Sequence, residues 1–496
     1  MRVALAVLSV SIVSVIALTV ERRWHHSNEY DAANRSANTN SSTSTGVDGT
    51  LNQGVPSTED AASNPPVDGA REAWWERAVD LRAMPEVWDA PNLVQARADG
   101  CYVTETRTAE DAPRGTPSSV TPPSTAPAME NPAGSIERGR DCGRGSMRWR
   151  YRTGDVVSSS AAFYNDAAVI GSRDGVLYAL NLRDGETRWK SEGHGGIDVI
   201  PHVKDDVVYF GTGQGQLVAV HAQTGADVWR VQNDGPGIFQ SSPTTYETLL
   251  VSGGGGNRLR GFKKSTGEKV WEYRTDLWVQ SSAAVRNGVA YIGSDDGWLH
   301  AVDAKTGKLR WRFAAALPGT FEEQSSTTVD LKITPDGHRS NVLSTPRFYK
   351  NLVFITSVGG VVYGVNADTG EEVWRHVGER SVSDTTVSED GVVYVHTDAA
   401  ILRAYEASTG RVLWASRTGT NKNVWSGPYQ TASAAVIHGD EVIIGGRDGD
   451  ITSYDRRTGR YLWSFRTGLW IQSTPKIQGD VLIVGSNDGW VYALNL

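Results

Sequence analysis

Few side chains in this 496-residue sequence have the types and spacing that metal binding or catalysis requires. The loops SDDG (294–297) and SNDG (486–489) each gather several oxygen atoms, which is an arrangement that calcium accepts. Neither loop is followed by a bidentate carboxylate, so tight-turn chemistry explains both better. The ten histidines show no metal-ligand spacing, and neither a phosphate loop nor a nucleophile elbow is present. We therefore predict no metal site and no catalytic residue.

The two cysteines, Cys101 and Cys142, are too few for a disulfide framework, a cysteine-rich zinc site or an iron–sulfur cluster. They bracket a stretch rich in proline. In an oxidising compartment they can pair and tie the preceding segment to the start of the folded domain. A disulfide and two free thiols remain alternatives, because pairing depends on a geometry that the sequence does not contain.

The elements that must position any site are repeats marked by tryptophan. Eight tryptophans each follow a glycine by four residues, and successive ones are 40, 40, 42, 40, 63, 40 and 49 residues apart. A basal period of about 40 residues with four short strands per unit is typical of a β-propeller blade. We assign structural docking roles between blades to these side chains: Trp149, Trp189, Trp229, Trp271, Trp311, Trp374, Trp414 and Trp463.

The two ends of the repeat region complement one another. The last unit stops at Leu496 after its third strand, whereas residues 147–151 form a fourth strand that no blade precedes. Pairing these ends leaves no blade with an unpaired face. The sequence thus predicts an all-β fold, an eight-bladed β-propeller over 145–496 whose N-terminal strand closes the last blade.

The unit AVDAKTGKLRW (301–311) resembles the repeat of pyrroloquinoline quinone (PQQ) dehydrogenases and their non-enzymatic relatives. Similar units span 219–229, 364–374 and 404–414, and the resemblance covers 145–496. It implies that each repeated tryptophan docks against the adjoining blade. Within the family, the chain is similar to the scaffold component of the outer-membrane β-barrel assembly machinery, an eight-bladed relative with compact blades and no cofactor.

Quinoprotein enzymes of this family hold PQQ against a disulfide between adjacent cysteines, with a calcium ion and an aspartate base. This sequence has no cysteine after Cys142, and most repeat units carry almost no insertion with which to bury a cofactor. We therefore predict no cofactor, PQQ included, and no enzymatic activity. The alternative is a PQQ-dependent oxidoreductase, or a degenerate relative that still binds a small ligand or a sugar.

The N-terminal part divides into four segments. Residues 1–23 are a signal peptide or signal anchor, and residues 24–68, rich in Ser, Thr, Asn and Gly, are a disordered linker. Residues 69–104 are predicted to form a short helical segment, and 105–144 a Pro/Ser/Thr-rich linker. We predict an exported protein, either periplasmic or membrane-anchored and facing the periplasm or the outside. Membrane association then occurs through the N-terminal segment if it stays uncleaved.

Candidate interaction residues lie on the face that carries the Asp-Gly turns and the connections between blades. The two longest connections include Phe321 in one, and Trp425 and Tyr429 in the other. Three further aromatic residues occur in repeated segments of the form aromatic-x-Gln-Ser or aromatic-Gln-Ser, which we expect beside the channel mouth. Their side chains either bind a peptide or a sugar or fill the junctions between blades. These aromatic residues are Phe239, Trp278 and Trp470.

Serines recur at one position of the innermost strand, where small side chains let eight strands crowd the axis. Spacing places Asp384 at that position in the sixth blade, which makes it a candidate carboxylate of the channel.

Charge argues against nucleic acid as a partner, because the net charge is -8 and the repeat region contains no Lys/Arg run. We predict an extracytoplasmic, non-catalytic propeller that acts as a scaffold for an envelope protein or peptide. The resemblance implies a role in envelope or outer-membrane protein assembly, although the chain lacks the lipidated cysteine usual in that scaffold. An extracytoplasmic sensor of a sugar or peptide is a third alternative, and it would need a signalling partner.

Overall fold

The computed structural model describes residues 132–233, 239, 241–254, 256–315, 340–378, 383–418 and 433–496. All of them belong to one compact unit, Glu72–Leu496. Several predictions lie outside the described residues: the signal segment 1–23, the linker 24–68, the helical segment 69–104, and the interaction candidates Phe321, Trp425 and Tyr429. Where the chain is described, no helix is long and apolar enough to cross a membrane.

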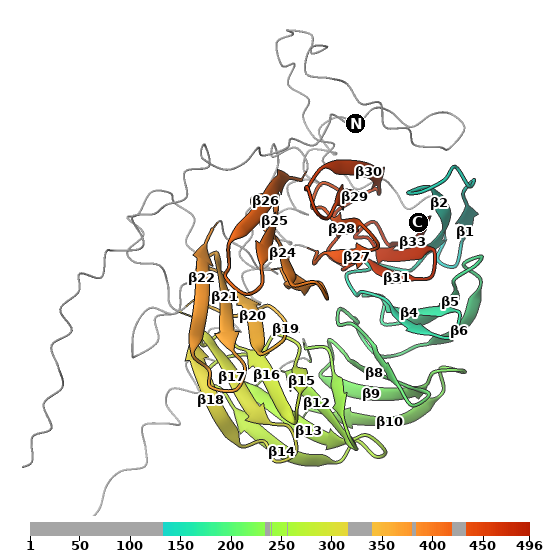
Figure 1. Cartoon of the computed structure of the whole chain (residues 1–496). Coiled ribbons are helices and arrows are strands. Elements are labelled where there is room, and N and C mark those ends of the chain that lie inside the picture. The colour runs from blue at the N-terminus through green and yellow to red at the C-terminus, as the bar shows by residue number, and fades with distance from the viewer. Residues whose placement is uncertain are drawn as a thin grey trace, which may run out of the picture. The chain divides into compact units, whose positions relative to one another are not determined.

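The described strands form eight antiparallel sheets arranged in a ring (Figure 1). This confirms the predicted eight-bladed propeller. From the innermost strand outward, the first four blades are β3 (Ala162–Tyr164), β4 (Ala167–Gly171), β5 (Leu177–Asn181), β6 (Thr187–Ser191); β7 (His202–Lys204), β8 (Val207–Gly211), β9 (Gln216–His221), β10 (Asp227–Gln232); β11 (Thr244–Tyr246), β12 (Leu249–Gly254), β13 (Arg258–Lys263), β14 (Lys269–Arg274); and β15 (Ala284–Arg286), β16 (Val289–Gly293), β17 (Trp298–Asp303), β18 (Leu309–Ala314).

The other four blades are β19 (Arg347–Tyr349), β20 (Leu352–Thr356), β21 (Val361–Asn366), β22 (Glu372–Val377); β23 (Thr386–Val387), β24 (Val392–His396), β25 (Ile401–Glu406), β26 (Val412–Arg417); β27 (Val436–His438), β28 (Glu441–Gly445), β29 (Asp450–Asp455), β30 (Tyr461–Arg466); and β31 (Lys476–Gln478), β32 (Val481–Gly485), β33 (Trp490–Asn495), β2 (Met147–Arg152), β1 (Ile136–Arg138).

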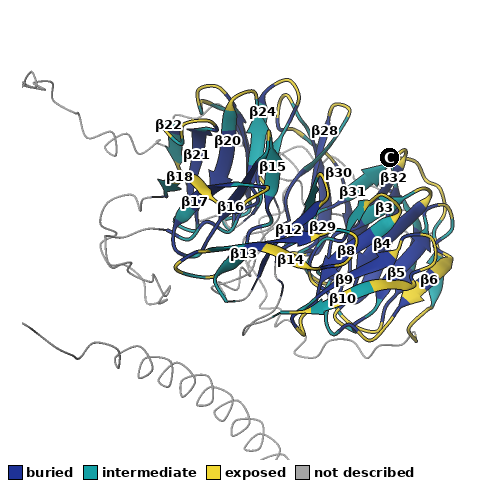
Figure 2. Ribbon diagram, turned by 90° about the horizontal axis from the view of Figure 1, so that it is seen from below, coloured by how far each residue is buried: buried dark blue, intermediate teal, exposed yellow. Residues whose placement is uncertain are grey.

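Burial within a blade follows the residue pattern of its strands. The second strands are short apolar runs such as AAVIG in β4 and VLIVG in β32, and every residue of both is buried, since neighbouring blades cover both faces of the sheet. The fourth strands alternate instead, as in TRWKS of β6, where the tryptophan is buried and its two predecessors are exposed. Figure 2 shows that burial decreases toward the outside of a blade, with exposed stretches on the fourth strands β6 and β14 and buried ones on the inner strands β8 and β9.

The predicted closure of the ring is confirmed. Strand β2 pairs antiparallel with β33, so that Trp149 lies opposite Ala493 and Tyr151 opposite Val491. The backbone NH of Gly145 donates to the carbonyl of Asn495 at 2.7 Å, which extends the seam beyond the strands. Two segments from opposite ends of the domain thus form one blade.

The seam contains a fifth strand that the sequence did not predict. Strand β1 falls inside the predicted linker 105–144, yet it pairs with β2, with Ile136 opposite Tyr151. The linker prediction is therefore wrong for residues 136–138. Ion pairs accompany the backbone pairing, because Glu137 bonds Arg150 at 2.6 Å within the blade and Arg138 bonds Glu186 of the first blade at 2.8 Å. The predicted linker 105–144 therefore contains an ordered edge strand.

The eight repeated tryptophans each contact the next blade. The Nε1 of Trp149 donates to the carbonyl of Leu182 at 3.0 Å, and its ring lies so close to Gly185 that a Cβ there would stand 2.8 Å away. The same ring-on-glycine contact joins Trp189 to Gly225, Trp229 to Gly267, Trp271 to Gly307, Trp311 to Gly370, Trp374 to Gly410, Trp414 to Gly459 and Trp463 to Gly145. The last of these contacts crosses the seam, so tryptophan docking runs around the whole ring.

The turns between second and third strands need one residue with positive φ. Gly175 supplies it in the first blade (φ 83°) and Gly297 in the fourth (φ 78°). In the sixth blade Ala400 takes this position with φ 57°, and its NH bonds the carbonyl of Thr397 as Gly175 bonds Ser172. An L-residue here carries backbone strain that glycine avoids.

Candidate functional site

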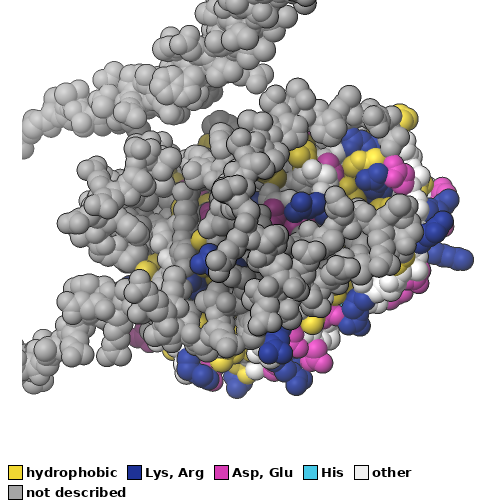
Figure 3. Space-filling view, turned by 90° about the horizontal axis from the view of Figure 1, so that it is seen from above, with side chains coloured by type: hydrophobic (Ala, Val, Ile, Leu, Met, Phe, Trp, Pro, Cys, Tyr) yellow, Lys and Arg dark blue, Asp and Glu magenta, His cyan; other side chains and the backbone are white. Residues whose placement is uncertain are grey.

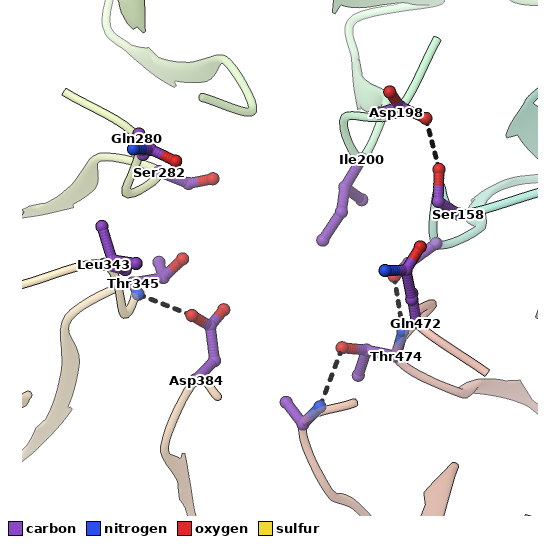
Figure 4. A pocket seen from close by; sticks show the side chains of 12 residues that line it. Ser158, Asp198, Ile200, Gln280, Ser282, Leu343, Thr345, Asp384, Gln472 and Thr474 are labelled. Atoms are coloured by element: carbon purple, nitrogen blue, oxygen red, sulfur yellow. Dashed lines mark hydrogen bonds between the residues drawn. The ribbon is translucent and has the colours of Figure 1, made fainter. Parts of the chain in front are cut away.

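A cavity of about 160 Å³ lies on the axis of the ring, between the segments that lead into the innermost strands (Figure 4). Its walls carry two amides, Gln280 and Gln472, and two carboxylates, Asp198 and Asp384. The remaining lining side chains are short hydroxyl or apolar ones: Ser158, Ser160, Ile200, Ser282, Leu343, Thr345, Ala434 and Thr474. The cavity is therefore mostly polar.

Strand alternation explains why these residues face the axis. At the recurring serine position the hydroxyl turns away from the axis: Ser281 Oγ accepts from the NH of Gly293 at 2.7 Å and donates to its carbonyl at 2.9 Å. The residues before and after that serine, Gln280 and Ser282, then point into the cavity. Ser473 makes the same pair of bonds with Gly485, and Gln472 and Thr474 flank it.

The structure corrects the position assigned to Asp384. Ser383, not Asp384, occupies the serine position of the sixth blade, because its hydroxyl bonds the carbonyl of His396 on the second strand. Thr386 pairs with Tyr394, as Arg347 pairs with Phe354 in the fifth blade, so Asp384 corresponds to Thr345. The cause is a longer first turn in the sixth blade, which shifts the innermost strand by one residue. Asp384 still faces the channel, but from the ring of residues that line it.

Side chains of this lining ring join neighbouring blades. The ring consists of the residues that follow the recurring serine position: Ser160, Ile200, Ser242, Ser282, Thr345, Asp384, Ala434 and Thr474. Five of these side chains accept a hydrogen bond from the equivalent backbone NH of the preceding blade, as Thr474 does from Ala434 at 3.3 Å and Ser160 from Thr474 at 2.8 Å. Asp384 Oδ1 takes the same place and accepts from Thr345 NH at 2.7 Å. The carboxylate thus substitutes for a hydroxyl and adds a charge to the wall.

Two of the predicted aromatic residues come two positions before the glutamines that line the cavity, Trp278 before Gln280 and Trp470 before Gln472, on the side that we call its mouth. Trp278 is 48% exposed, and the adjacent Leu277–Trp278 segment is matched in the eighth blade by Leu469, 39% exposed, and the half-buried Trp470. Below Trp278, Gln280 Nε2 donates to Asp295 Oδ2 at 2.7 Å, which fixes the segment against the neighbouring turn.

Phe239 is not part of this surface. It is only 3% exposed, and its ring packs at 6.5 Å from that of Phe262. Gly211 leaves the room for it, since a Cβ there would lie 2.3 Å from Phe239 Cβ. The interaction prediction for Phe239 is therefore wrong, and the alternative that it pads a blade junction is correct.

The Asp-Gly turns use their carboxylates within the fold. Asp296 is 1% exposed and accepts from the NH of Trp298 at 3.0 Å and of Asp276 at 3.1 Å, while His300 Nε2 lies 3.2 Å away. Asp488 accepts from Gly468 NH at 2.7 Å and from the Tyr492 hydroxyl at 2.7 Å. Within the described ranges, no group of three or more His, Cys, Asp or Glu side chains is placed to hold a metal ion.

The residues at the axis do not fit PQQ. Pockets for ligands of cofactor size usually measure about 300–1,000 Å³ and have largely apolar or aromatic walls. This cavity measures about 160 Å³, and its described lining contains no aromatic ring and no cysteine. The chain has only Cys101 and Cys142, so it cannot form a disulfide between adjacent residues. Cys142 is disulfide-bonded in the structure, whereas its predicted partner Cys101 lies outside the described residues.

Sequence comparison finds relatives among envelope assembly proteins and beyond them. The chain is 26% identical to outer membrane protein assembly factor BamB of Yersinia pestis over 267 residues, which is 47% of this chain and 65% of that protein. Identity to BamB of Burkholderia pseudomallei is 24% over 362 residues, or 72% and 79% of the two chains. Identity to the serine/threonine-protein kinase AfsK of Streptomyces coelicolor is 26%, over 57% of this chain and 37% of the kinase. The match thus spans less than two thirds of the Yersinia protein and of the kinase.

Solved structures share the fold. BamB from Moraxella catarrhalis superposes with a TM-score of 0.59 at 19% identity, covering 71% of this chain and 99% of that one. The quinohemoprotein alcohol dehydrogenase from Comamonas testosteroni reaches a TM-score of 0.58 at 13% identity, over 71% and 76%. The family model described as outer membrane protein assembly factor BamB matches residues 173–345 and 340–496, which is more than half of the chain. This chain therefore belongs to the BamB family of PQQ-like propellers.

Proposed function

We propose that this chain is an exported, non-catalytic propeller that binds another envelope protein and serves as a scaffold in outer-membrane protein assembly. Family membership supports the class of function, since relatives that match much of the chain are named assembly factors. The misfit between the axial cavity and PQQ favours this function over a quinone-dependent oxidoreductase. The observation that carries the proposal is the exposure of apolar side chains in two equivalent segments at the mouth of the channel, Leu277–Trp278 and Leu469–Trp470.

Trp278 and Leu469 are large apolar side chains held out to solvent on rigid supports. The residue after Trp278, Val279, is 1% exposed, and Ile471, two residues after Leu469, is fully buried. Aromatic side chains on such ordered backbone lose little entropy when a partner covers them, which is the property of interface hot spots. We propose that the partner docks over this mouth.

The described outer strands are less suited to that role. Figure 3 shows one side of the molecule, where, among the coloured atoms, Lys and Arg side chains stand beside Asp and Glu side chains. The outer strands carry many such pairs, for example Arg230 with Asp227 and Arg310 with Asp303 at 2.8 Å. Exposed aliphatic residues such as Val373 occur among these charges as single positions, which are normal on monomer surfaces.

The test is affinity capture from envelope membranes with the full chain, after reversible cross-linking. Trp278→Ala combined with Leu469→Ala should abolish capture of outer-membrane assembly components while leaving the melting temperature unchanged. The matched control is Val373→Ala, which removes an aliphatic side chain that is 50% exposed on an outer strand. Unchanged capture by the double variant would contradict the docking site, and dye reduction by the purified chain with PQQ and an alcohol would contradict the non-catalytic role.

A further inference from the structure

Two long cations project from the innermost strands where the other blades carry short or neutral side chains. In each blade we compare the residue that comes two positions after the lining ring. In successive blades these residues are Ala162, His202, Thr244, Ala284, Arg347, Thr386, Val436 and Lys476. Strand alternation gives this position the same facing as the lining ring, and it lies about 7 Å further along the axis. Arg347 and Lys476 therefore stand next to the floor of the cavity, directly beyond Thr345 and Thr474.

The charges at this floor do not cancel. Arg347 Nη2 lies 3.7 Å from Asp384 Oδ2, which is longer than a hydrogen bond, and Asp384 Oδ1 is already bonded to the backbone of Thr345. Lys476 has neither a hydrogen bond nor an ion pair with any residue that the structure describes. Two cations thus share one carboxylate, which leaves one positive charge in excess.

Burial makes that excess charge unfavourable. Burial lowers the pKa of Lys476, and the neighbouring Arg347 lowers it further, while Asp384 partly offsets both. No other titratable side chain acts on Lys476 among the described groups. A partly buried cation without a counter-ion is costly unless an anion or water completes it.

We propose that the axial channel binds the carboxylate group of a small polar molecule between Arg347 and Lys476. A single excess charge matches a monoanion, whereas a dianion would leave a net negative charge in a partly desolvated site. The planar guanidinium of Arg347, 40% exposed, offers paired NH donors to a carboxylate. The cavity above then holds the polar body of the ligand against Gln280, Gln472 and the hydroxyls of the lining ring.

The charged groups of this site are separate from the docking surface at Trp278. They lie within the ring, not on its face, and come from strands β19 and β31 and the segment before β23, whereas the cavity above them includes Gln280 and Gln472, two residues after Trp278 and Trp470. A failure of partner capture would therefore not contradict the carboxylate site, and a failure of acetate binding would not contradict the docking surface.

The experiment measures binding of ¹³C-acetate to the full chain by NMR line broadening at pH 7. Lys476→Met should weaken binding about tenfold or more, because it removes a charge-assisted hydrogen bond, and should raise the melting temperature without ligand. Asp384→Asn should strengthen binding severalfold, because it removes the competing anion beside Arg347. Lys308→Met, at an exposed turn, is the matched control and should change nothing.

A second measurement needs no variant. After reductive ¹³C-methylation of the lysines, the signal that Lys476→Met lacks should move on addition of acetate to the unsubstituted chain. Inorganic phosphate should bind more weakly than acetate. The proposal is overturned if phosphate binds more tightly, if chloride competes equally well, or if acetate leaves the Lys476 signal in place.

Discussion

At the scale of single residues, the side chain of Glu441 takes the place of a backbone carbonyl as the hydrogen-bond acceptor of the last repeated tryptophan. Seven of the repeated tryptophans donate Nε1 to a backbone carbonyl of the next blade, but Trp463 donates to Glu441 Oε2 at 2.8 Å. This carboxylate is nearly buried, accepts from Ser453 Oγ at 2.6 Å and pairs with Arg144 of the seam. Spacing alone identified Trp463, whereas Glu441 looked like any strand-initial residue.

Substitution of this carboxylate should weaken the seam. Glu441→Gln removes the charge that supports three donors in a buried place, so we expect a loss of about 2–3 kcal/mol in the free energy of unfolding. Urea unfolding measures it. Glu186→Gln, which loses the exposed ion pair to Arg138, is the control and should cost less than about 0.5 kcal/mol. Equal losses in the two variants would show that Glu441 has no special role.

Two buried histidines make stability depend on pH. Burial lowers the pKa of His194 and of His396 to about 4, and each ring bonds one hydroxyl, Ser191 and Thr418 respectively. An unfolded histidine titrates near 6.5, so between about pH 6.5 and 4 the unfolded chain binds more protons. Stability should therefore fall as pH falls through this window, by up to about 3 kcal/mol for each histidine. Urea midpoints at pH 7 and pH 4.5 for His194→Gln and His396→Gln should show a flatter slope than the unsubstituted chain, with His221→Gln at the surface as control.

At the scale of elements, the sequence predicted strands and turns well but missed a shift within one blade. The tryptophans Trp374 and Trp414 are 40 residues apart, as in a regular unit. Compared with the fifth blade, the turn between the first and second strands of this unit is one residue longer. The connection that leads into its first strand is one residue shorter than in a regular unit, so the period of 40 residues is unchanged. Only the pairing of Thr386 with Tyr394 reveals the shift, which is why Asp384 was assigned to the serine position.

The turn at Ala400 offers an element-scale test. Ala400→Gly relieves a left-handed residue with φ 57° and should stabilise the chain by about 1 kcal/mol. Gly175→Ala at the equivalent turn should destabilise it by at least as much, because φ is 83° and a Cβ would lie 3.1 Å from the NH of Gly195. Melting temperatures of the two variants decide it, and shifts of the same sign would contradict the equivalence of the turns.

The axial site lay beyond sequence reasoning for a related reason. Arg347, Asp384 and Lys476 come from three blades, and only the closed ring brings them near one another. The one available signal was a long cation at a position where other blades carry Ala, His, Thr or Val. Recognising this pattern requires the correct alignment of the innermost strands, including the sixth, in which Ser383 and not Asp384 is the recurring serine.

At the scale of the whole molecule, the seam should dominate stability. Deletion of residues 145–152 removes β2 and leaves β33 paired only with β32, so we expect a large drop in melting temperature or loss of folding. Deletion of residues 24–110 removes none of the described strands and should change the melting temperature much less. Circular dichroism during heating compares the two, and equal melting temperatures would rule out the closure as the main constraint.

The same seam fixes the order of events when the chain is made. Strand β2 is among the first parts of the propeller to be synthesised, and its partner β33 is the last. The first blade to begin is therefore the last to be finished, and contacts of such long sequence separation form slowly. In every chain that terminates before β33, β2 can still pair with β1 but its other edge stays open, a recognisable mark by which proteases can sort incomplete products from finished ones.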